Sequence, residues 1–209
     1  FWADRESISN EELAAGLPED DYLRRAGAVA KLELFRNTLD RPEHLEDFPN
    51  LVELAIHLEV FPRAVHLTRM ALLQRLCITE TGLRALAGME ACTSLTHLDC
   101  SHNKLAELDG RVLRRLPRLR TLWANDNALE HMRGLEGLPA LRSLWLGSNR
   151  IPAVCDALVH NASLEELNLS GNLVSNFKDV PNLARMRKLT TLSFGDPHFG
   201  DNPLCSLCN

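Results

Sequence analysis

Leucine and other apolar residues recur along this chain at a fixed spacing. Four segments have apolar residues at their first, fourth, sixth and eleventh positions and asparagine at their ninth, in the pattern L-x-x-L-x-L-x-x-N-x-L. These segments are LTHLDCSHNKL from Leu95, LRTLWANDNAL from Leu119, LRSLWLGSNRI from Leu141 and LEELNLSGNLV from Leu164. Self-similarity at a period of roughly 20 to 30 residues is typical of a solenoid.

Weaker copies of the pattern extend the array in both directions. They are VAKLELFRNTL from Val29, LVELAIHLEVF from Leu51, LQRLCITETGL from Leu73 and LTTLSFGDPHF from Leu189. The eight units therefore start at residues 29, 51, 73, 95, 119, 141, 164 and 189. This spacing predicts an α/β leucine-rich repeat solenoid, a horseshoe with an eight-stranded parallel concave sheet and short helical or 3₁₀ turns on the convex side.

Each position of the repeat has a physical role. The apolar positions point into the coil, where one repeat cannot bury them alone, so neighbouring repeats must stack. The ninth residue lies where the chain leaves its strand, and an amide side chain there can pair with backbone groups that the turn leaves without partners. We therefore expect a buried structural ladder of Asn103, Asn127, Asn149 and Asn172. Glu59, Thr81 and Pro197 replace the asparagine in repeats two, three and eight, which predicts looser or differently built turns there.

The two ends need caps, because a terminal coil would leave its apolar face in water. Residues 1–28 lack the repeat, and the capping-box sequence Ser9 to Glu12 together with Pro18 predicts a short helical N-terminal cap. The repeats then occupy 29–196, and the loop-rich stretch 197–209 is expected to be a C-terminal cap. Because the chain starts without Met and stops at Asn209, we expect a fragment of a longer protein.

Composition and charge narrow the function classes. The net charge of -5 comes from well-mixed acidic and basic residues, which provides no basic stripe for nucleic acid. The sequence contains neither a run of about 18 apolar residues nor a signal-peptide pattern, so no membrane span is expected. The six cysteines stand at irregular spacings, which fits reduced thiols in a cytoplasmic protein. We expect a monomer in isolation.

The candidate binding surface follows from the alternation of side chains along each strand. The third, fifth and seventh residues of a repeat should face the concave side, which puts Trp123 and Trp145 on neighbouring strands. Exposed tryptophans are enriched at the centres of protein interfaces, although two such rings could also simply cover each other. The expected partner-binding set is Trp123, Trp145, His97, Asp99, Ser101, Asn125, Ser143 and Asn168.

Chemistry other than binding finds little support. Five residues on adjacent strands raise a metal-site hypothesis, but no ligand pair has a tight spacing, so we expect none: His57, Cys77, His97, Asp99 and His102. The Cys205-x-x-Cys208 motif lacks a second ligand pair and is more simply explained as two packed thiols. Serine, histidine and aspartate occur without a nucleophile elbow or an oxyanion loop. We expect no enzyme activity and no cofactor.

The repeat of about 22 residues, with phrases such as GLPALRSL, resembles the intracellular leucine-rich repeat class that includes the nuclear regulatory subunit of protein phosphatase 1 and axonemal dynein light chain 1. The last repeats and the tail, from LNLSGNLVSNF to DNPLCSLCN, are similar to leucine-rich-repeat-containing protein nine and its relatives. The resemblance implies a scaffold or adaptor in ciliary, flagellar or cytoskeletal assembly. The alternative is a regulatory subunit that docks on an enzyme such as protein phosphatase 1.

Overall fold

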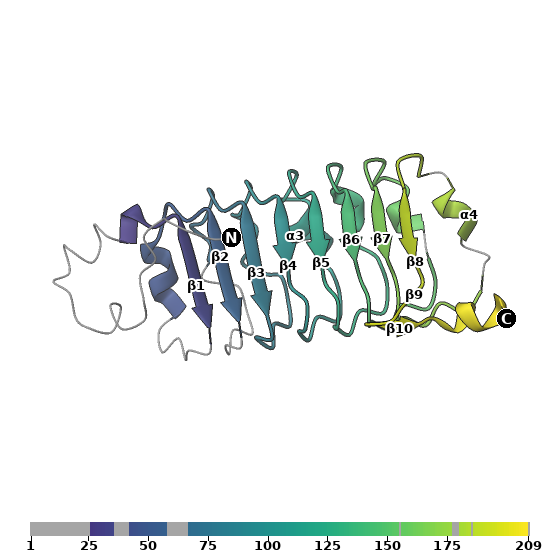
Figure 1. The fold of residues 1–209 in the computed structure, drawn as a ribbon. Coiled ribbons are helices and arrows are strands. Elements are labelled where there is room, and N and C mark those ends of the chain that lie inside the picture. Colours follow the sequence, from purple (N-terminus) through teal and green to yellow (C-terminus); the bar gives the residue numbers. More distant parts are fainter. Residues whose placement is uncertain are drawn as a thin grey trace.

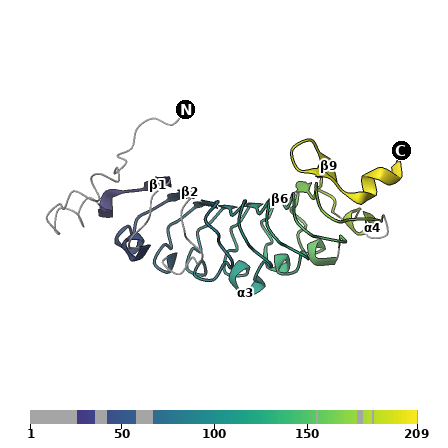
Figure 2. The same cartoon turned by 90° about the horizontal axis from the view of Figure 1, so that it is seen from below.

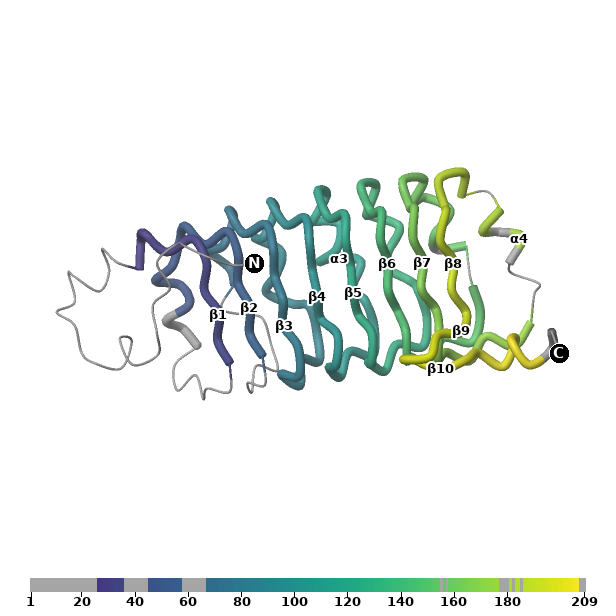
Figure 3. The backbone as a smooth tube through the Cα atoms, in the orientation of Figure 1, coloured from purple at the N-terminus to yellow at the C-terminus, as the bar shows by residue number. Residues whose placement is uncertain are grey.

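The computed structural model describes residues 26–35, 42–57, 67–154, 156–176, 180–184 and 186–208. Eight strands form one parallel sheet in sequence order, as the solenoid prediction requires (Figures 1 and 3). They are β1 (Lys31–Phe35), β2 (Glu53–His57), β3 (Arg75–Thr79), β4 (His97–Asp99), β5 (Thr121–Trp123), β6 (Ser143–Trp145), β7 (Glu166–Asn168) and β8 (Thr191–Ser193). The predicted fold class is confirmed.

Every strand pairs with the next so that equivalent repeat positions lie side by side. Leu98 is opposite Leu122, and Leu122 is opposite Leu144. These leucines are at most 1% exposed, and they belong to one apolar core that runs the length of the solenoid. Because each leucine row is continuous, every coil depends on its neighbours for the burial of its apolar face.

Short helical turns return the chain along the side opposite the sheet, as predicted (Figure 2). They are η1 (Pro42–Asp47), α3 (Gly110–Leu113), η3 (Leu135–Gly137), η4 (Asp156–Leu158) and α4 (Val180–Leu183). Repeats of this length leave room for about one turn, because the strand and two bends use most of the residues. In the part of the chain that the structure describes, no helix is long and apolar enough to cross a membrane.

The predicted asparagine ladder holds the turns that follow β4, β5, β6 and β7. Asn149 Nδ2 donates to the carbonyls of Leu146 and Gly147 in its own repeat and to Ala124 of the preceding repeat, at 2.9 to 3.1 Å. Its Oδ1 accepts the backbone N–H of Leu129 at 3.0 Å. Equivalent bonds are made by Asn103, Asn127 and Asn172. Each amide therefore ties two successive coils together.

The burial of the ladder is uneven. Asn149 and Asn172 are 7% and 3% exposed, whereas Asn103 and Asn127 are only partly buried. Thr81, which replaces asparagine in the third repeat, is itself buried, and its N–H and hydroxyl both donate to Asn103 Oδ1 at 3.1 Å. That turn is built differently, as expected. Glu59 lies outside the described residues, as do Ser9 to Glu12 and Pro18.

The eighth repeat contains an insertion that the sequence pattern did not reveal. Asn202 Nδ2 donates to the carbonyls of Leu169 and Phe194 at 2.7 Å, and its Oδ1 accepts the N–H of Val174 at 2.9 Å. Asn202 thus takes the ladder position that the pattern assigns to Pro197. The extra residues form an antiparallel hairpin, the insertion hairpin, of β9 (Gly195–Asp196) and β10 (Gly200–Asp201). The expected boundary between the repeats and the C-terminal cap, after residue 196, therefore falls inside the eighth repeat. The helix η5 (Pro203–Cys208) follows the hairpin.

The insertion hairpin stands on the sheet side of the solenoid, opposite α3 (Figure 2). The Phe199 ring at its tip meets the Trp145 ring edge to face, with centroids 6.4 Å apart. Two glycines in the underlying turns make room: a Cβ on Gly147 would lie 2.8 Å from the Phe199 ring, and a Cβ on Gly171 would meet the Phe199 carbonyl. Gly171 also has a positive φ of 64°, which favours glycine. The hairpin is therefore seated on repeats six and seven by close backbone approach.

We predict that Asn149→Ala destabilises the domain by about 1 to 3 kcal/mol, because it leaves the buried Leu129 N–H without its acceptor. Chemical denaturation followed by circular dichroism measures the loss. The matched control is Asn50→Ala, since Asn50 is exposed and its side chain makes one hydrogen bond within the described residues, to the Gly27 carbonyl at 2.7 Å. Equal losses for the two variants would contradict the structural role of the ladder.

We predict that Gly147→Ala lowers the free energy of unfolding by about 1 to 3 kcal/mol, because the added methyl group must displace the Phe199 ring. Gly27→Ala is the control, since none of the described residues has an atom within 4 Å of its added Cβ. The control should change the denaturation midpoint little. A Gly147→Ala variant as stable as Gly27→Ala would show that the insertion hairpin is not held against this turn.

Candidate functional site

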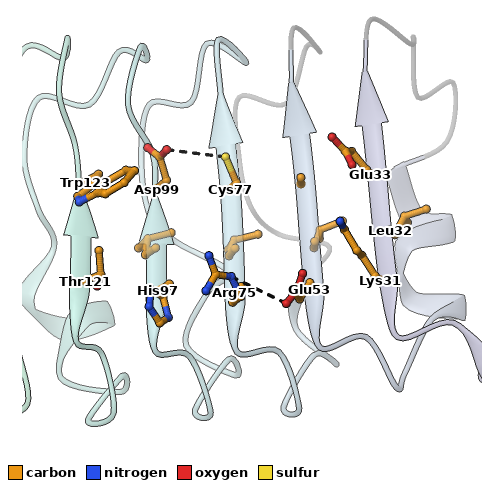
Figure 4. A pocket seen from close by; sticks show the side chains of 14 residues that line it. Lys31, Leu32, Glu33, Glu53, Arg75, Cys77, His97, Asp99, Thr121 and Trp123 are labelled. Atoms are coloured by element: carbon orange, nitrogen blue, oxygen red, sulfur yellow. Dashed lines mark hydrogen bonds and ion pairs between the residues drawn. The ribbon is translucent and has the colours of Figure 1, made fainter. Parts of the chain in front are cut away.

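A hollow of about 410 Å³ lies on the concave side of β1 to β5 (Figure 4). We call it the concave hollow. The side chains that line it form two rows, because the third and fifth residues of each repeat point to the same side of the sheet. The row nearer the carboxyl ends of the strands contains Glu33, Ala55, Cys77, Asp99 and Trp123, and the other contains Lys31, Glu53, Arg75, His97 and Thr121.

The first row combines acidic, apolar and aromatic groups. Asp99 Oδ1 accepts the Ser101 N–H at 3.0 Å, and the Cys77 thiol lies 3.8 Å from Asp99 Oδ2. Burial, followed by the negative charge of Asp99, raises the pKa of Cys77 to about 12. Cys77 is therefore a neutral, weakly reactive thiol at physiological pH. The row ends at Trp123, whose indole ring borders the hollow.

The second row is largely compensated within itself. Arg75 Nε lies 3.9 Å from Glu53 Oε1. His97 Nδ1 lies 2.8 Å from the Thr96 hydroxyl, and burial with the neighbouring Arg75 and Arg120 charges lowers the pKa of His97. An imidazole with a lowered pKa is neutral at physiological pH. His97 thus adds a polar, uncharged group to the hollow.

The two tryptophans pack against each other but differ in exposure. Their ring centroids are 5.4 Å apart with an interplanar angle of 34°, and their strands pair them in register. Trp123 is 38% exposed, whereas Trp145 is partly buried beneath Phe199, and its Nε1 has no hydrogen-bond partner among the described residues. The two rings therefore cover each other in part, and of the pair only Trp123 offers substantial exposed surface. The binding role of the pair stays a prediction.

Three residues expected to bind a partner are buried instead. Ser101, Asn125 and Asn168 are 4%, 6% and 5% exposed. The Ser101 hydroxyl accepts the Asn125 N–H at 3.2 Å, Asn125 Oδ1 accepts the Gly147 N–H at 2.8 Å, and Asn168 Oδ1 accepts the Ser170 N–H at 2.9 Å. Their side chains are used within the turns, so our proposed binding surface excludes them. Ser143 is partly buried and donates to Glu166 Oε2 at 2.6 Å.

The residues of the metal hypothesis do not converge. The described residues contain no group of three or more histidine, cysteine, aspartate or glutamate side chains that could hold an ion. His57 Nδ1 lies 2.6 Å from the Thr79 hydroxyl, and His102 Nδ1 lies 3.0 Å from Asp126 Oδ2, on a turn beyond the strands. Cys205 approaches the Phe194 carbonyl at 3.4 Å, while the side chain of Cys208 lies outside the described residues.

Sequence reasoning missed Phe199 and its neighbour His198, whose rings are 4.7 Å apart at the edge of this surface. The pattern aligned Phe199 with a core leucine, because the insertion was not recognised. The available signal was Asn202-Pro203-Leu204, which has the N-x-L form of a repeat turn five residues after position nine. Leu204 is 2% exposed and occupies the core position.

Comparisons with known proteins agree with the fold. The family model described as leucine-rich repeats (2 copies) matches residues 93–133. An internalin C2 from Listeria monocytogenes superposes with a TM-score of 0.71 at 18% identity, over 87% of this chain and 81% of the other. A leucine-rich repeat protein of Leptospira interrogans superposes with a TM-score of 0.73 at 18% identity, over 95% of this chain and 59% of the other. Likenesses at this identity show the fold alone.

A curated relative adds a nearer sequence match. The geranylgeranyl transferase type-2 subunit alpha of Bos taurus is 44% identical over 92 residues, which is 43% of this chain. The chain covers only 16% of the length of that relative. These matches do not confirm the resemblance of the tail to leucine-rich-repeat-containing protein nine. The repeat pattern, the parallel solenoid of the described residues and these likenesses together show that the chain has a leucine-rich repeat fold.

Proposed function

We propose that this chain is a non-catalytic protein-interaction domain, a scaffold or adaptor that holds a protein partner on its concave face at Trp123. The observation that carries the proposal is the exposed Trp123 ring at one end of the concave hollow. Leucine-rich repeat proteins generally bind other proteins, and the curvature of a solenoid creates an extended concave surface for this purpose.

Trp123 has the properties of an interface anchor. Its ring offers a large apolar area on a rigid strand, and stacking on Trp145 fixes its orientation at little further entropic cost. The polar residues His97, Asp99 and Ser143 lie on the same sheet face. In protein interfaces, a few anchors of this kind carry most of the binding energy. The residues around them contribute little energy but exclude water from the centre of the complex.

Two settings are proposed for this binding. A scaffold role in ciliary, flagellar or cytoskeletal assembly is supported by the resemblance of the last repeats and tail to leucine-rich-repeat-containing protein nine. The alternative, a regulatory domain that docks on an enzyme such as protein phosphatase 1, has one specific observation in its favour: the curated relative is a subunit of a transferase. Both settings use the same surface and differ in the partner.

We predict that Trp123→Ala weakens binding of the protein partner by about tenfold or more, because it removes the aromatic anchor. Affinity capture with wild type and variant, followed by mass spectrometry, identifies the proteins that depend on Trp123, and calorimetry with each purified protein gives its Kd. Cytoskeletal components among them would favour the scaffold role, and an enzyme would favour the regulatory role.

The control for this experiment is Leu173→Ala, which removes a 53% exposed apolar side chain from the turn after β7 and should leave binding unchanged. Trp123→Ala should itself cost less than the about 3 to 5 kcal/mol expected for a fully buried tryptophan, because the ring is 38% exposed. Trp145 is left intact because its replacement would also unseat Phe199. Capture of the same proteins by wild type and Trp123→Ala would remove the concave face as the binding surface.

A further inference from the structure

The carboxylate of Asp99 lies in the concave hollow without a cation. Its Oδ1 accepts a hydrogen bond from the Ser101 N–H. Among the described residues, its Oδ2 has one polar contact, the Cys77 thiol at 3.8 Å. No ion pair joins Asp99 to a basic side chain among the described residues, in contrast to Glu53 and Glu165, which each have an arginine within 4 Å. This edge of the hollow therefore carries negative charge that a partner could neutralise.

Trp123 stands directly beside this carboxylate. Asp99 and Trp123 are register partners on β4 and β5, which places their backbones about 4.8 Å apart, and Figure 4 shows both side chains on the same face. One side of the indole is covered by Trp145, while Trp123 lines the hollow shared with Asp99. The face of an indole ring is electron-rich and attracts cations. An indole ring beside a carboxylate that has no ion pair among the described residues is therefore a favourable place for a positive charge.

Among the described residues, the groups next to Asp99 and Trp123 do not supply that charge. Cys77 and Ala55 continue the row from Asp99 and provide an uncharged floor, against which the aliphatic stem of a lysine or arginine can lie. Arg75 is directed to Glu53 in the other row. His97 is neutral at physiological pH because burial and nearby arginines lower its pKa. Thus none of the basic side chains in the part of the chain that the structure describes forms an ion pair with Asp99.

We propose that the concave hollow recognises a lysine or arginine side chain of its protein partner, held between the Trp123 ring and the Asp99 carboxylate. The inference rests on the proposed function and specifies the partner's chemistry. Charge complementarity selects this occupant over a purely apolar side chain, which would cover Asp99 and leave its charge uncompensated. The partner segment therefore carries a basic residue at the centre of its contact surface.

Selection from a random dodecapeptide display library on the immobilised protein tests this inference. Peptides bound by the wild type should be enriched in lysine or arginine at one position. Asp99→Asn should lose this enrichment while it still binds peptides, because the asparagine oxygen can accept the Ser101 N–H and preserve the local structure. The charge-matched control Glu130→Gln, which neutralises an exposed carboxylate outside the hollow, should keep the enrichment.

Calorimetry with one selected peptide and its variant in which norleucine replaces the basic residue gives the size of the effect. The wild-type domain should bind the basic peptide about three- to tenfold more tightly than the neutral one, from one ion pair and one cation–π contact. Asp99→Asn should reduce this ratio toward one, and added salt should do the same in the wild type. Trp123→Ala should weaken both peptides.

The possible outcomes separate the inference from the proposed function. Peptides that depend on Trp123 but show no preference for a basic residue would overturn the inference and leave the binding face in place. An equal preference in wild type and Asp99→Asn would also overturn it. Failure to select any peptide that depends on Trp123 would overturn both the binding face and the inference.

Discussion

Each strand of this solenoid ends where the chain turns away from the sheet, and the backbone groups of that turn would be buried without partners if no side chain reached them. The amide of the ladder asparagine meets this need in both directions, with one nitrogen for carbonyls and one oxygen for the N–H of the preceding repeat. The threonine hydroxyl is shorter and has a single hydrogen to donate, so Thr81 instead donates to the next asparagine, Asn103.

The functional surface depends on the same constraint. Because each asparagine bonds to two successive coils, the strands stay in register and equivalent side chains form rows across the sheet. A row brings together residues that are about 22 positions apart in sequence, such as Cys77, Asp99 and Trp123. The charge and shape of the hollow are therefore set by single residues in separate repeats, while the leucines and asparagines hold the frame.

The regular part of this arrangement could be predicted from the sequence. The period gave the eight strands, the buried leucines, the ladder and the pairing of Trp123 with Trp145, since each follows from local geometry repeated many times. Burial of Ser101 and Asn125 could not be predicted, because alternation tells which face a side chain lies on and not how closely the turns approach each other there. The insertion hairpin was missed because it interrupts the pattern between Phe194 and Asn202, and its contact with Trp145 joins residues far apart in sequence.

That contact explains why two equivalent tryptophans have different roles. An aromatic ring on the concave face has two faces. Trp123 and Trp145 lie on neighbouring strands and stack, so each ring covers one face of the other. For Trp145 the insertion hairpin adds Phe199, with Gly147 and Gly171 providing the space, so this ring becomes part of an internal aromatic cluster. Trp123 has no such cover and borders Asp99 instead. The hairpin therefore leaves Trp123 as the more exposed ring of the tryptophan pair, and the register of β4 and β5 places this ring next to Asp99.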